Sequence, residues 1–445
     1  MRIDGRSFVS GATALVATGS LGQVIGAASP AHARAAAFRG FGELMQDPDG
    51  IIDLPHGFQY SAFSREGDAL TNAGIVPSDH DGMAAFSAGL SGVWLVRNHE
   101  VHRGDVEDGK IPALAGEGCS TYDPEGPGGT TTLLVGFDRK LRRHHVSLAG
   151  TLNNCAGGPS PWRTWLTCEE SVETIGKPHG YVFEVDPRCG GNPEPIIAMG
   201  RFAHEAVAFD RRGVAYLSED AVRPFGCLYR MLPEKPLAGR GSLHAGGALQ
   251  AAAISGVDRD LSTVQEPGTV LPVRWIAVEN VNPSDGETPL REQVVGRGAT
   301  PIPKAEGVWT DHDGRVWFTS SYASTTAGYP SAAAHSGQIW RYDPGEETIT
   351  LVVIVPVGSA WDGPDNITAS PHGFALACND GGGDQFLMGI NREGGIFPFA
   401  QNVLNKSEFA GATFSPTGRT LFVNIQNPGM TLAIWGPWCS SQLFD

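Results

Sequence analysis

The segment from Asn153 to Glu170 concentrates side chains that bind metal ions. It holds a thiol at Cys155, amides at Asn153 and Asn154, and a carboxylate at Glu170, on either side of a Gly-Gly-Pro turn. Such a turn ends one strand and starts another, so it can bring both ends of the segment together. A lone cysteine is more often an ordinary buried hydrophobic residue. The segment therefore indicates either one wall of a metal site or a core hairpin with solvated acids.

Four other segments repeat one hairpin pattern when they are aligned on a turn glycine. In three of them an acid stands eight residues before that glycine, at Glu205, Glu306 and Asp365, whereas the fourth has Ala410 there. We expect the three carboxylates to start inner strands of radially arranged sheets and to converge on a common axis. Converging acids repel one another unless cations neutralise them. The pattern favours a metal site, and acids that only cap solvent-facing turns are the alternative.

Short strands are the elements that must position these acids. From Trp94 to Trp435, apolar runs alternate with Gly, Pro, Asp and Asn turns, without a long amphipathic helical period. One hairpin that recurs at irregular separations is typical of radial sheets with inserted loops. The sequence therefore predicts an all-β chain, a six-bladed β-propeller with loop insertions. One insertion is expected in residues 241–300, with a short helix near residues 290–295.

The first 33 residues have the composition of an export signal. Arg2 and Arg6 precede an apolar run of small residues, and Ala31-His32-Ala33 fits a small-x-small cleavage site. We expect residues 1–33 to be a signal peptide, residues 34–445 to be a single propeller domain, and the mature protein to be periplasmic or secreted. The export route stays open, because Gly5 stands where a twin-arginine signal would have its first arginine.

Charge and missing motifs exclude several classes of function. The formal net charge of −16 disfavours partners such as nucleic acid or an anionic membrane, and it favours bound cations. Beyond the signal, no apolar run reaches the roughly 20 residues that a membrane span needs. Serine-hydrolase, Walker and dinucleotide-binding motifs do not occur in the sequence, nor does the histidine spacing of zinc proteases. Seven cysteines cannot all pair with one another, so at least one thiol is free.

The motifs along the chain resemble those of the PhoX family of exported alkaline phosphatases. The matching segments occur in order over most of the chain: Arg97–Glu100, Cys155–Glu170, Phe202–Ala206, Tyr216–Asp220, Ala299–Gly307, Gly363–Asn366 and Phe409–Pro416. The resemblance implies a propeller that hydrolyses phosphate monoesters by a two-metal mechanism, with an iron pair and nearby calcium ions at the mouth of its channel. A small phosphate ester is then the expected partner, and the oligomeric state stays open.

The resemblance also implies ligand roles for individual residues. Cys155, Glu205 and Glu306 resemble iron ligands. The residues that resemble calcium-side or bridging ligands are Glu100, Glu170, Glu219, Asp220 and Asp365, with amide oxygens from Asn98, Asn153 and Asn366. The chemistry of the donors agrees with this division, because iron(III) accepts carboxylates together with a thiolate, whereas calcium takes only hard oxygen ligands.

One position departs from the family pattern. Where the family reads Arg-Pro-Glu-Gly, this chain has Lys304, Ala305, Glu306 and Gly307. Lys304 can supply the positive charge but not the bidentate geometry of an arginine. We expect Lys304 and Glu306 to act in catalysis. Because lysine replaces the arginine of the family pattern, we also expect a lower activity than that of the family or a different substrate.

Two other functions fit a propeller that holds metal ions. A calcium-dependent hydrolase of the lactonase type would need neither iron nor a thiolate. A non-catalytic, metal-stabilised binding propeller is favoured by the lysine at position 304. Activity on a phosphate ester and the effect of replacing Cys155 distinguish the three.

Overall fold

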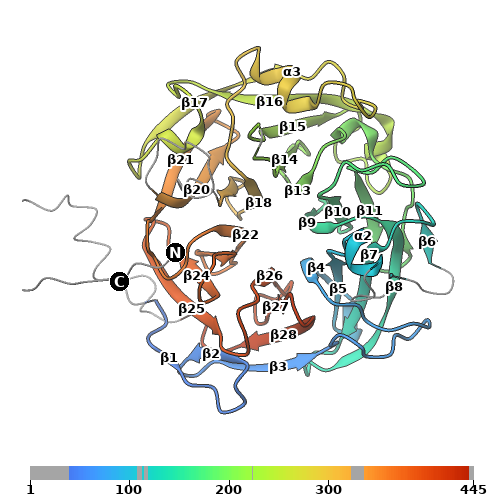
Figure 1. The fold of residues 1–445 in the computed structure, drawn as a ribbon. Coiled ribbons are helices and arrows are strands. Elements are labelled where there is room, and N and C mark those ends of the chain that lie inside the picture. Colours follow the sequence, from blue (N-terminus) through green and yellow to red (C-terminus); the bar gives the residue numbers. More distant parts are fainter. Residues whose placement is uncertain (1–39, 108–112, 115–118, 223, 322–334, 440–445) are drawn as a thin grey trace, which may run out of the picture. The chain divides into compact units, whose positions relative to one another are not determined.

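Nearly all regular secondary structure is β-strand, almost entirely in antiparallel pairs, in a computed structural model of the chain (Figure 1). It describes residues 40–107, 113–114, 119–222, 224–321 and 335–439. The export signal expected in residues 1–33 therefore lies outside the described residues. The α-helices in the described part are short, α2 (Arg103–Glu107) and α3 (Leu290–Val295), and no helix there has the length and apolar composition to cross a membrane. The predicted all-β class and the helix near residues 290–295 are confirmed.

Six inner strands form a closed ring within the described residues. They are β4 (His80–Ser87), β9 (Asn154–Pro159), β13 (His204–Phe209), β18 (Ala305–Thr310), β22 (Pro364–Ala369) and β26 (Phe409–Phe414). Each contacts the next around the ring, and β26 contacts β4. From each of them a sheet runs outwards from the centre (Figure 1). This radial arrangement is that of a β-propeller, the architecture that the repeated hairpins predicted.

We number the blades 1 to 6 by their inner strands in chain order. Blade 1 adds β5 (Val93–His99), β7 (Gly128–Val135), β8 (Leu141–Thr151) and the short β6 (Ser120–Thr121). Blade 2 adds β10 (Trp165–Glu169), β11 (Val182–Asp186) and β12 (Gly190–Gly191). Blade 3 adds β14 (Ala215–Glu219), β15 (Leu228–Pro233), β16 (Gly247–Ile254) and β17 (Val270–Ala277). Blade 4 adds β19 (Val316–Ser320), β20 (His335–Asp343) and β21 (Thr348–Pro356), and it joins blade 3 through the β17–β21 pair.

The two ends of the described chain meet in the last two blades. Blade 6 adds β27 (Leu421–Ile425), β28 (Met430–Trp435) and, from the beginning of the chain, β3 (Gln59–Phe63). Blade 5 adds β23 (Ala375–Asn379), β24 (Phe386–Ile390), β25 (Ile396–Asn402) and the early strands β2 (Ile52–Pro55) and β1 (Leu44–Met45). Because β3 pairs with β28, blade 6 combines both ends of the chain and closes the ring. The sheet edges that remain in such a radial arrangement are short and protected.

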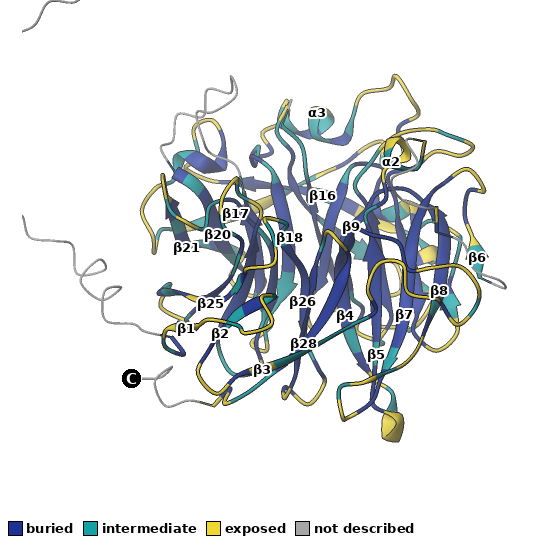
Figure 2. Cartoon of the chain, turned by 60° about the horizontal axis from the view of Figure 1, so that its bottom comes forward, coloured by how far each residue is buried: buried dark blue, intermediate teal, exposed yellow. Residues whose placement is uncertain are grey.

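Burial follows the position of a strand within its blade. All residues of β14 and β23, the second strands of blades 3 and 5, are buried, whereas β21 at the outside alternates buried and half-buried residues. Figure 2 shows the same gradient, with buried inner strands and exposed loops. Large side chains such as Trp165 of blade 2 pack against Val96 of blade 1. The core therefore lies between the blades and holds the inner strands rigidly.

Candidate metal centre

The second residue of each inner strand lies at one end of the ring. These six positions are occupied by Asp81, Cys155, Glu205, Glu306, Asp365 and Ala410. In the pairing of β4, β13, β18 and β22 with their neighbours, the register shifts at this point, which marks a β-bulge. A bulge re-aims the side chain at its position. Five blades thus direct a carboxylate or a thiol toward the axis, and blade 6 contributes only a methyl group.

A second set of polar residues follows the second strand of each blade. The residues directly after β5, β10, β14, β19, β23 and β27 are Glu100, Glu170, Asp220, Ser321, Asp380 and Gln426. Four of the six are acids. The Ser321 hydroxyl donates to Glu306 Oε1 at 2.6 Å, and the Gln426 amide donates to Glu100 Oε2 at 3.0 Å. The propeller repeat therefore builds two stacked rings of polar groups at the same end.

The two rings merge into one continuous arc of candidate metal ligands. Four sets of three residues hold ligand atoms within 4.8 Å of one another: Asp81, Glu100 and Cys155; Cys155, Glu170 and Glu205; Glu205, Glu306 and Asp365; and Asp365, Asp380 and Glu408. Neighbouring sets share Cys155, Glu205 or Asp365, so the arc is unbroken. It brings together six of the predicted ligands, Cys155, Glu205, Glu306, Glu100, Glu170 and Asp365.

Small residues close the channel behind the acids. Gly82, Ala156, Ala206, Gly307 and Gly411 occupy the third position of their inner strands. A Cβ on Gly307 would lie 2.7 Å from Ile367 N, and one on Gly82 would lie 2.5 Å from the backbone of Ala156, so the strands approach too closely for larger side chains. The cavity that remains at this level measures about 20 Å³, about enough for one water molecule. A substrate must therefore reach the acids from the mouth of the channel.

Burial and mutual repulsion raise the pKa values of these acids. Burial is the largest cause throughout, and the nearest carboxylates add to it: the pKa of Asp81 rises to about 7 and that of Glu306 to about 7. The pKa values of Glu205 and Asp365 rise well above their ordinary values for the same reasons. Burial, and then Asp81, also raise the pKa of the Cys155 thiol. Such groups are stable only when they hold protons or share cations.

The donor set fits metal ions. Asp81 Oδ1, Asn153 Oδ1 and Asp220 Oδ1 are buried and have no hydrogen-bond partner, although buried acceptors are otherwise bonded in nearly all cases. A cation would satisfy such atoms. Cys155 adds a single sulfur, and its thiol donates to Glu205 Oε1 at 3.2 Å. All seven cysteines lie in described residues and none forms a disulfide, so Cys155 is available as a ligand.

Lys304 lies at the edge of the arc, next to Glu306 and Asp220. Its Nζ is 3.0 Å from Glu306 Oε1 and 3.5 Å from Asp220 Oδ2. The charge of Glu306, followed by that of Asp220, raises the pKa of Lys304 despite burial. The ammonium is therefore charged and supplies positive charge at one side of the mouth. The structure also places Asp220 near the predicted ligands through this contact.

Three predicted ligands, Glu219, Asn366 and Asn98, are engaged elsewhere. The Asn98 oxygen accepts the Trp165 indole N–H and the Thr167 hydroxyl, each at 2.8 Å. Both carboxylate oxygens of Glu219 are bonded, Oε1 to Arg291 at 2.7 Å and Oε2 to the Tyr229 hydroxyl at 2.7 Å. Glu219 is outside the four acid sets because adjacent residues of a strand point to opposite sides. The Asn366 oxygen accepts the N–H of Gly411 at 2.8 Å, and its amide donates to Asp365 Oδ1 at 3.1 Å. In this arrangement Asn366 orients Asp365.

Arg291→Gln is expected to destabilise the fold with little effect on catalysis. Glu219 is fully buried, so removal of its partner leaves an unpaired carboxylate and costs about 3 kcal/mol. Urea unfolding measures the loss, and turnover by the native protein should stay within a few-fold. Arg103→Gln is the matched control, because its pair with Glu107 is exposed and contributes about 0.5 kcal/mol. A loss of turnover as large as that of an acid variant would instead place Glu219 in the metal centre.

Three members of the arc were missed in the sequence, Asp81, Asp380 and Glu408. Asp81 stands eight residues before Gly89, the same spacing that identified Glu205, Glu306 and Asp365, so the repeat itself could have revealed it. Asp380 directly follows a second strand, as Glu100 and Glu170 do. No repeated spacing marks Glu408, which precedes β26 in a blade without an acid at the second position.

Comparison with known proteins agrees with this geometry. A family model described as alkaline phosphatase PhoX matches residues 39–429 of the chain. The chain belongs to the PhoX family. Its enzyme class is therefore that of a phosphoric monoester hydrolase, built on a propeller. No curated protein matches the chain.

Solved structures provide a second comparison for this PhoX family member. PhoX of Pseudomonas fluorescens, in complex with vanadate as a transition state analogue, is 19% identical, with a TM-score of 0.66 over 89% of this chain and 98% of that one. At this identity the likeness shows the fold alone. A gluconolactonase of Xanthomonas campestris is 12% identical over 90% of this chain and 99% of that one, but its TM-score of 0.44 carries no argument.

Proposed function

We propose that this chain hydrolyses phosphate monoesters at a centre of several metal ions held by the two rings of acids. The convergence of buried carboxylates on one thiol, with unpartnered acceptor atoms among them, is the observation that carries the proposal. Iron would bind next to Cys155, with Glu205 and Glu306. Calcium would bind through oxygen ligands, such as Glu100 and Glu170 beside Cys155 and the set of Asp365, Asp380 and Glu408.

The residues of the chain have distinct roles in this proposal. When bound, the cations would hold phosphate oxygens and lower the pKa of the attacking oxygen. The Lys304 ammonium, between Glu306 and Asp220, would attract the phosphate and offset the negative charge of the acids. Gln426, Ser321 and Asn366 orient acids of the arc by hydrogen bonds. The narrow channel behind the acids has room for about one water molecule and none for a substrate.

Elemental analysis together with an activity assay tests the proposal. We expect the purified full chain to contain iron and calcium and to hydrolyse an aryl phosphate in the presence of calcium. Absence of iron after growth with ample iron would contradict the iron assignment. Iron without hydrolysis would instead support a metal-stabilised binding propeller.

Cys155→Ser is expected to lower the iron content and to reduce kcat/KM on an aryl phosphate at least about tenfold. A hydroxyl cannot replace a thiolate as a soft ligand, whereas the surrounding oxygen ligands would still bind calcium. Metal content and steady-state kinetics measure both effects. Cys189→Ser is the control, because Cys189 is exposed. Unchanged iron and turnover would favour a calcium-dependent, lactonase-type chemistry, which needs no thiol.

Export is a further part of the proposal. Residues 1–33 combine an apolar run with a small-x-small site, and we infer a periplasmic or secreted mature protein that begins near Arg34. N-terminal sequencing of the protein from separated cell fractions tests this. An intact N-terminus in the cytoplasmic fraction would contradict it.

A further inference from the structure

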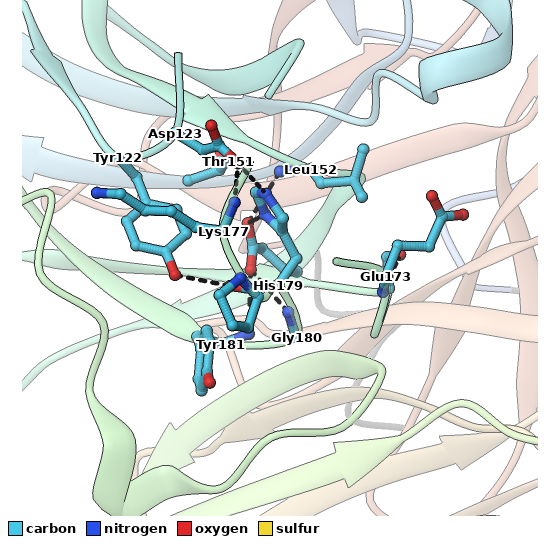
Figure 3. A network of polar contacts seen from close by, with 12 residues as sticks. Tyr122, Asp123, Thr151, Leu152, Glu173, Lys177, His179, Gly180 and Tyr181 are labelled. Atoms are coloured by element: carbon cyan, nitrogen blue, oxygen red, sulfur yellow. Dashed lines mark hydrogen bonds and ion pairs between the residues drawn. The ribbon is translucent and has the colours of Figure 1, made fainter. Parts of the chain in front are cut away.

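A buried histidine, His179, lies between the carboxylates of Glu169 and Asp123. Figure 3 shows it beside Asp123, Lys177 and Tyr122. His179 Nδ1 is 2.6 Å from Glu169 Oε1, and His179 Nε2 is 3.3 Å from Asp123 Oδ2. The side chains of His179 and Glu169 are 0% exposed and that of Asp123 is 1% exposed. Asp123 follows β6 in blade 1, whereas Glu169 ends β10 in blade 2. His179 therefore links blades 1 and 2 by contacting one carboxylate of each.

The geometry requires His179 to be protonated. A neutral imidazole has one N–H and one acceptor nitrogen, whereas an imidazolium donates from both. Each ring nitrogen of His179 faces a carboxylate oxygen. When both carboxylates are ionised, only the cation can donate to both. Burial by itself would lower the pKa of His179, but the hydrogen bond and charge of Glu169, and then those of Asp123, outweigh burial and raise it.

Two other cations of the described residues, Arg201 and Lys177, lie close to His179 without bonding its ring. The Arg201 guanidinium approaches His179 only through the backbone carbonyl, to which Nε donates at 2.8 Å. The Tyr122 ring packs edge-on against the imidazole, with the Lys177 ammonium beyond it, 4.7 Å from the ring centre. The His179 cation is therefore bonded to two anions, and its removal would leave Glu169 and Asp123 buried with like charge.

Glu169 ties together the two strands that present the metal ligands. Its Oε1 accepts the N–H of Leu152 at 2.9 Å, and its Oε2 accepts the N–H groups of Gly180 at 2.8 Å and Tyr181 at 3.1 Å. Leu152 lies just before β9, which carries Cys155, and Glu169 is the neighbour of Glu170. The Glu170 N–H in turn donates to Asn153 O at 2.9 Å. The Glu169 carboxylate thus adds a link between the start of β9 and the end of β10, which are also paired through their backbones.

We propose that His179 is a positioning residue, whose positive charge holds Glu169 and thereby the Cys155–Glu170 side of the metal centre. The inference rests on the proposed metal centre. His179 touches neither metal ligand nor substrate and acts only through Glu169. Since its pKa in the folded protein is raised above the ordinary 6.5, its contribution is complete below about pH 6.5 and is lost as pH rises through the folded pKa.

The test compares calcium binding by the wild-type chain and His179→Gln. The purified full chain is stripped with a chelator and titrated calorimetrically with Ca²⁺ alone, between about pH 6 and about pH 9. We expect the variant to bind Ca²⁺ about tenfold more weakly at the acid end. The ratio of the two affinities should approach one as pH rises, because the wild type then loses its imidazolium too. Protonation of the ligands themselves affects both proteins and cancels in the ratio.

Two further variants separate charge from packing. His144→Gln is the matched control, because His144 is also buried but bonds the Ser64 hydroxyl and the Ala69 carbonyl rather than carboxylates. It should leave Ca²⁺ binding unchanged. Asp123→Asn removes one of the two anions and lowers the pKa of His179. The Ca²⁺ affinity of this variant should therefore fall at a lower pH than that of the wild type. If His179→Gln does not fold, comparison of Asp123→Asn with the wild type still tests the inference.

The possible outcomes distinguish this inference from the proposed function. Equal affinities of wild type and His179→Gln, or a ratio that does not vary with pH, would overturn the positioning role while the metal centre stands. If the wild type itself binds no Ca²⁺, the proposed centre fails, and the inference fails with it. An Asp123→Asn profile identical to that of the wild type would likewise contradict a role for the imidazolium charge.

Discussion

Glu306→Gln is expected to reduce kcat/KM on an aryl phosphate by about 10³-fold. The substitution keeps the shape of the side chain but removes the charge that faces Glu205, Asp365 and Lys304. The stability of the metal-free protein should move in the opposite direction. Because the pKa of Glu306 is raised to about 7, its ionisation opposes folding, and the neutral glutamine should add on the order of 3 kcal/mol at alkaline pH. Kinetics and urea unfolding measure the two effects.

The opposite signs make this prediction specific. A variant that loses activity through misfolding would lose stability as well. Glu306→Gln should instead lose activity while its metal-free form gains stability. Glu279→Gln is the control, because Glu279 lies on the surface with a 78% exposed side chain and should change neither. Turnover within tenfold of the wild type would exclude Glu306 as an essential ligand.

Removal of the metal ions is expected to reverse the pH dependence of stability in the acidic range. The raised pKa values of Asp81 and Glu306, both to about 7, mean that the folded metal-free protein binds more protons than the unfolded chain. Its free energy of unfolding should therefore fall as pH rises from about 4 through about 7, by on the order of 3–4 kcal/mol for each of these two groups. Unfolding after chelation, measured across this range, tests the slope.

Readdition of metal provides the control for this prediction. Ca²⁺ should restore stability at neutral and alkaline pH, because a ligand that binds only the folded state stabilises it in proportion to the logarithm of its concentration. Glu306→Gln should reduce the slope of the metal-free protein, since one of the titrating groups is gone. A chelated protein that is as stable at pH 8 as at pH 5, and that does not respond to Ca²⁺, would contradict the electrostatic account of the centre.

The first ring, formed by the second residues of the inner strands, was largely predictable from the sequence. Glu205, Glu306 and Asp365 share one spacing to a turn glycine, and each proves to be the second residue of an inner strand. A repeated hairpin places equivalent residues at equivalent positions around the axis, so a sequence period becomes a geometric ring. Asp81 obeys the same rule and could have been found by it.

The second ring, formed by the residues directly after the second strand of each blade, could be predicted only once the ends of those strands were known. Glu219 and Asp220 are adjacent acids, and nothing in their order shows that Glu219 pairs with Arg291 while Asp220 approaches Lys304. A shift of one residue along a strand turns a side chain to the opposite side. Strand ends depend on pairing with neighbours and on loop length, so neither Asp380 nor the exclusion of Glu219 could be predicted.

The sequence by itself determined the propeller class, the family and the acids of the inner strands, because these follow from short-range spacing that a repeated hairpin converts into symmetry. Only the tertiary structure decided how the arc is completed and supported. His179 meets Asp123 and Glu169 across two blades, and Glu408, just before β26 of blade 6, joins Asp365 and Asp380 of blade 5. Such contacts depend on how the blades pack against one another, and no local spacing records that packing.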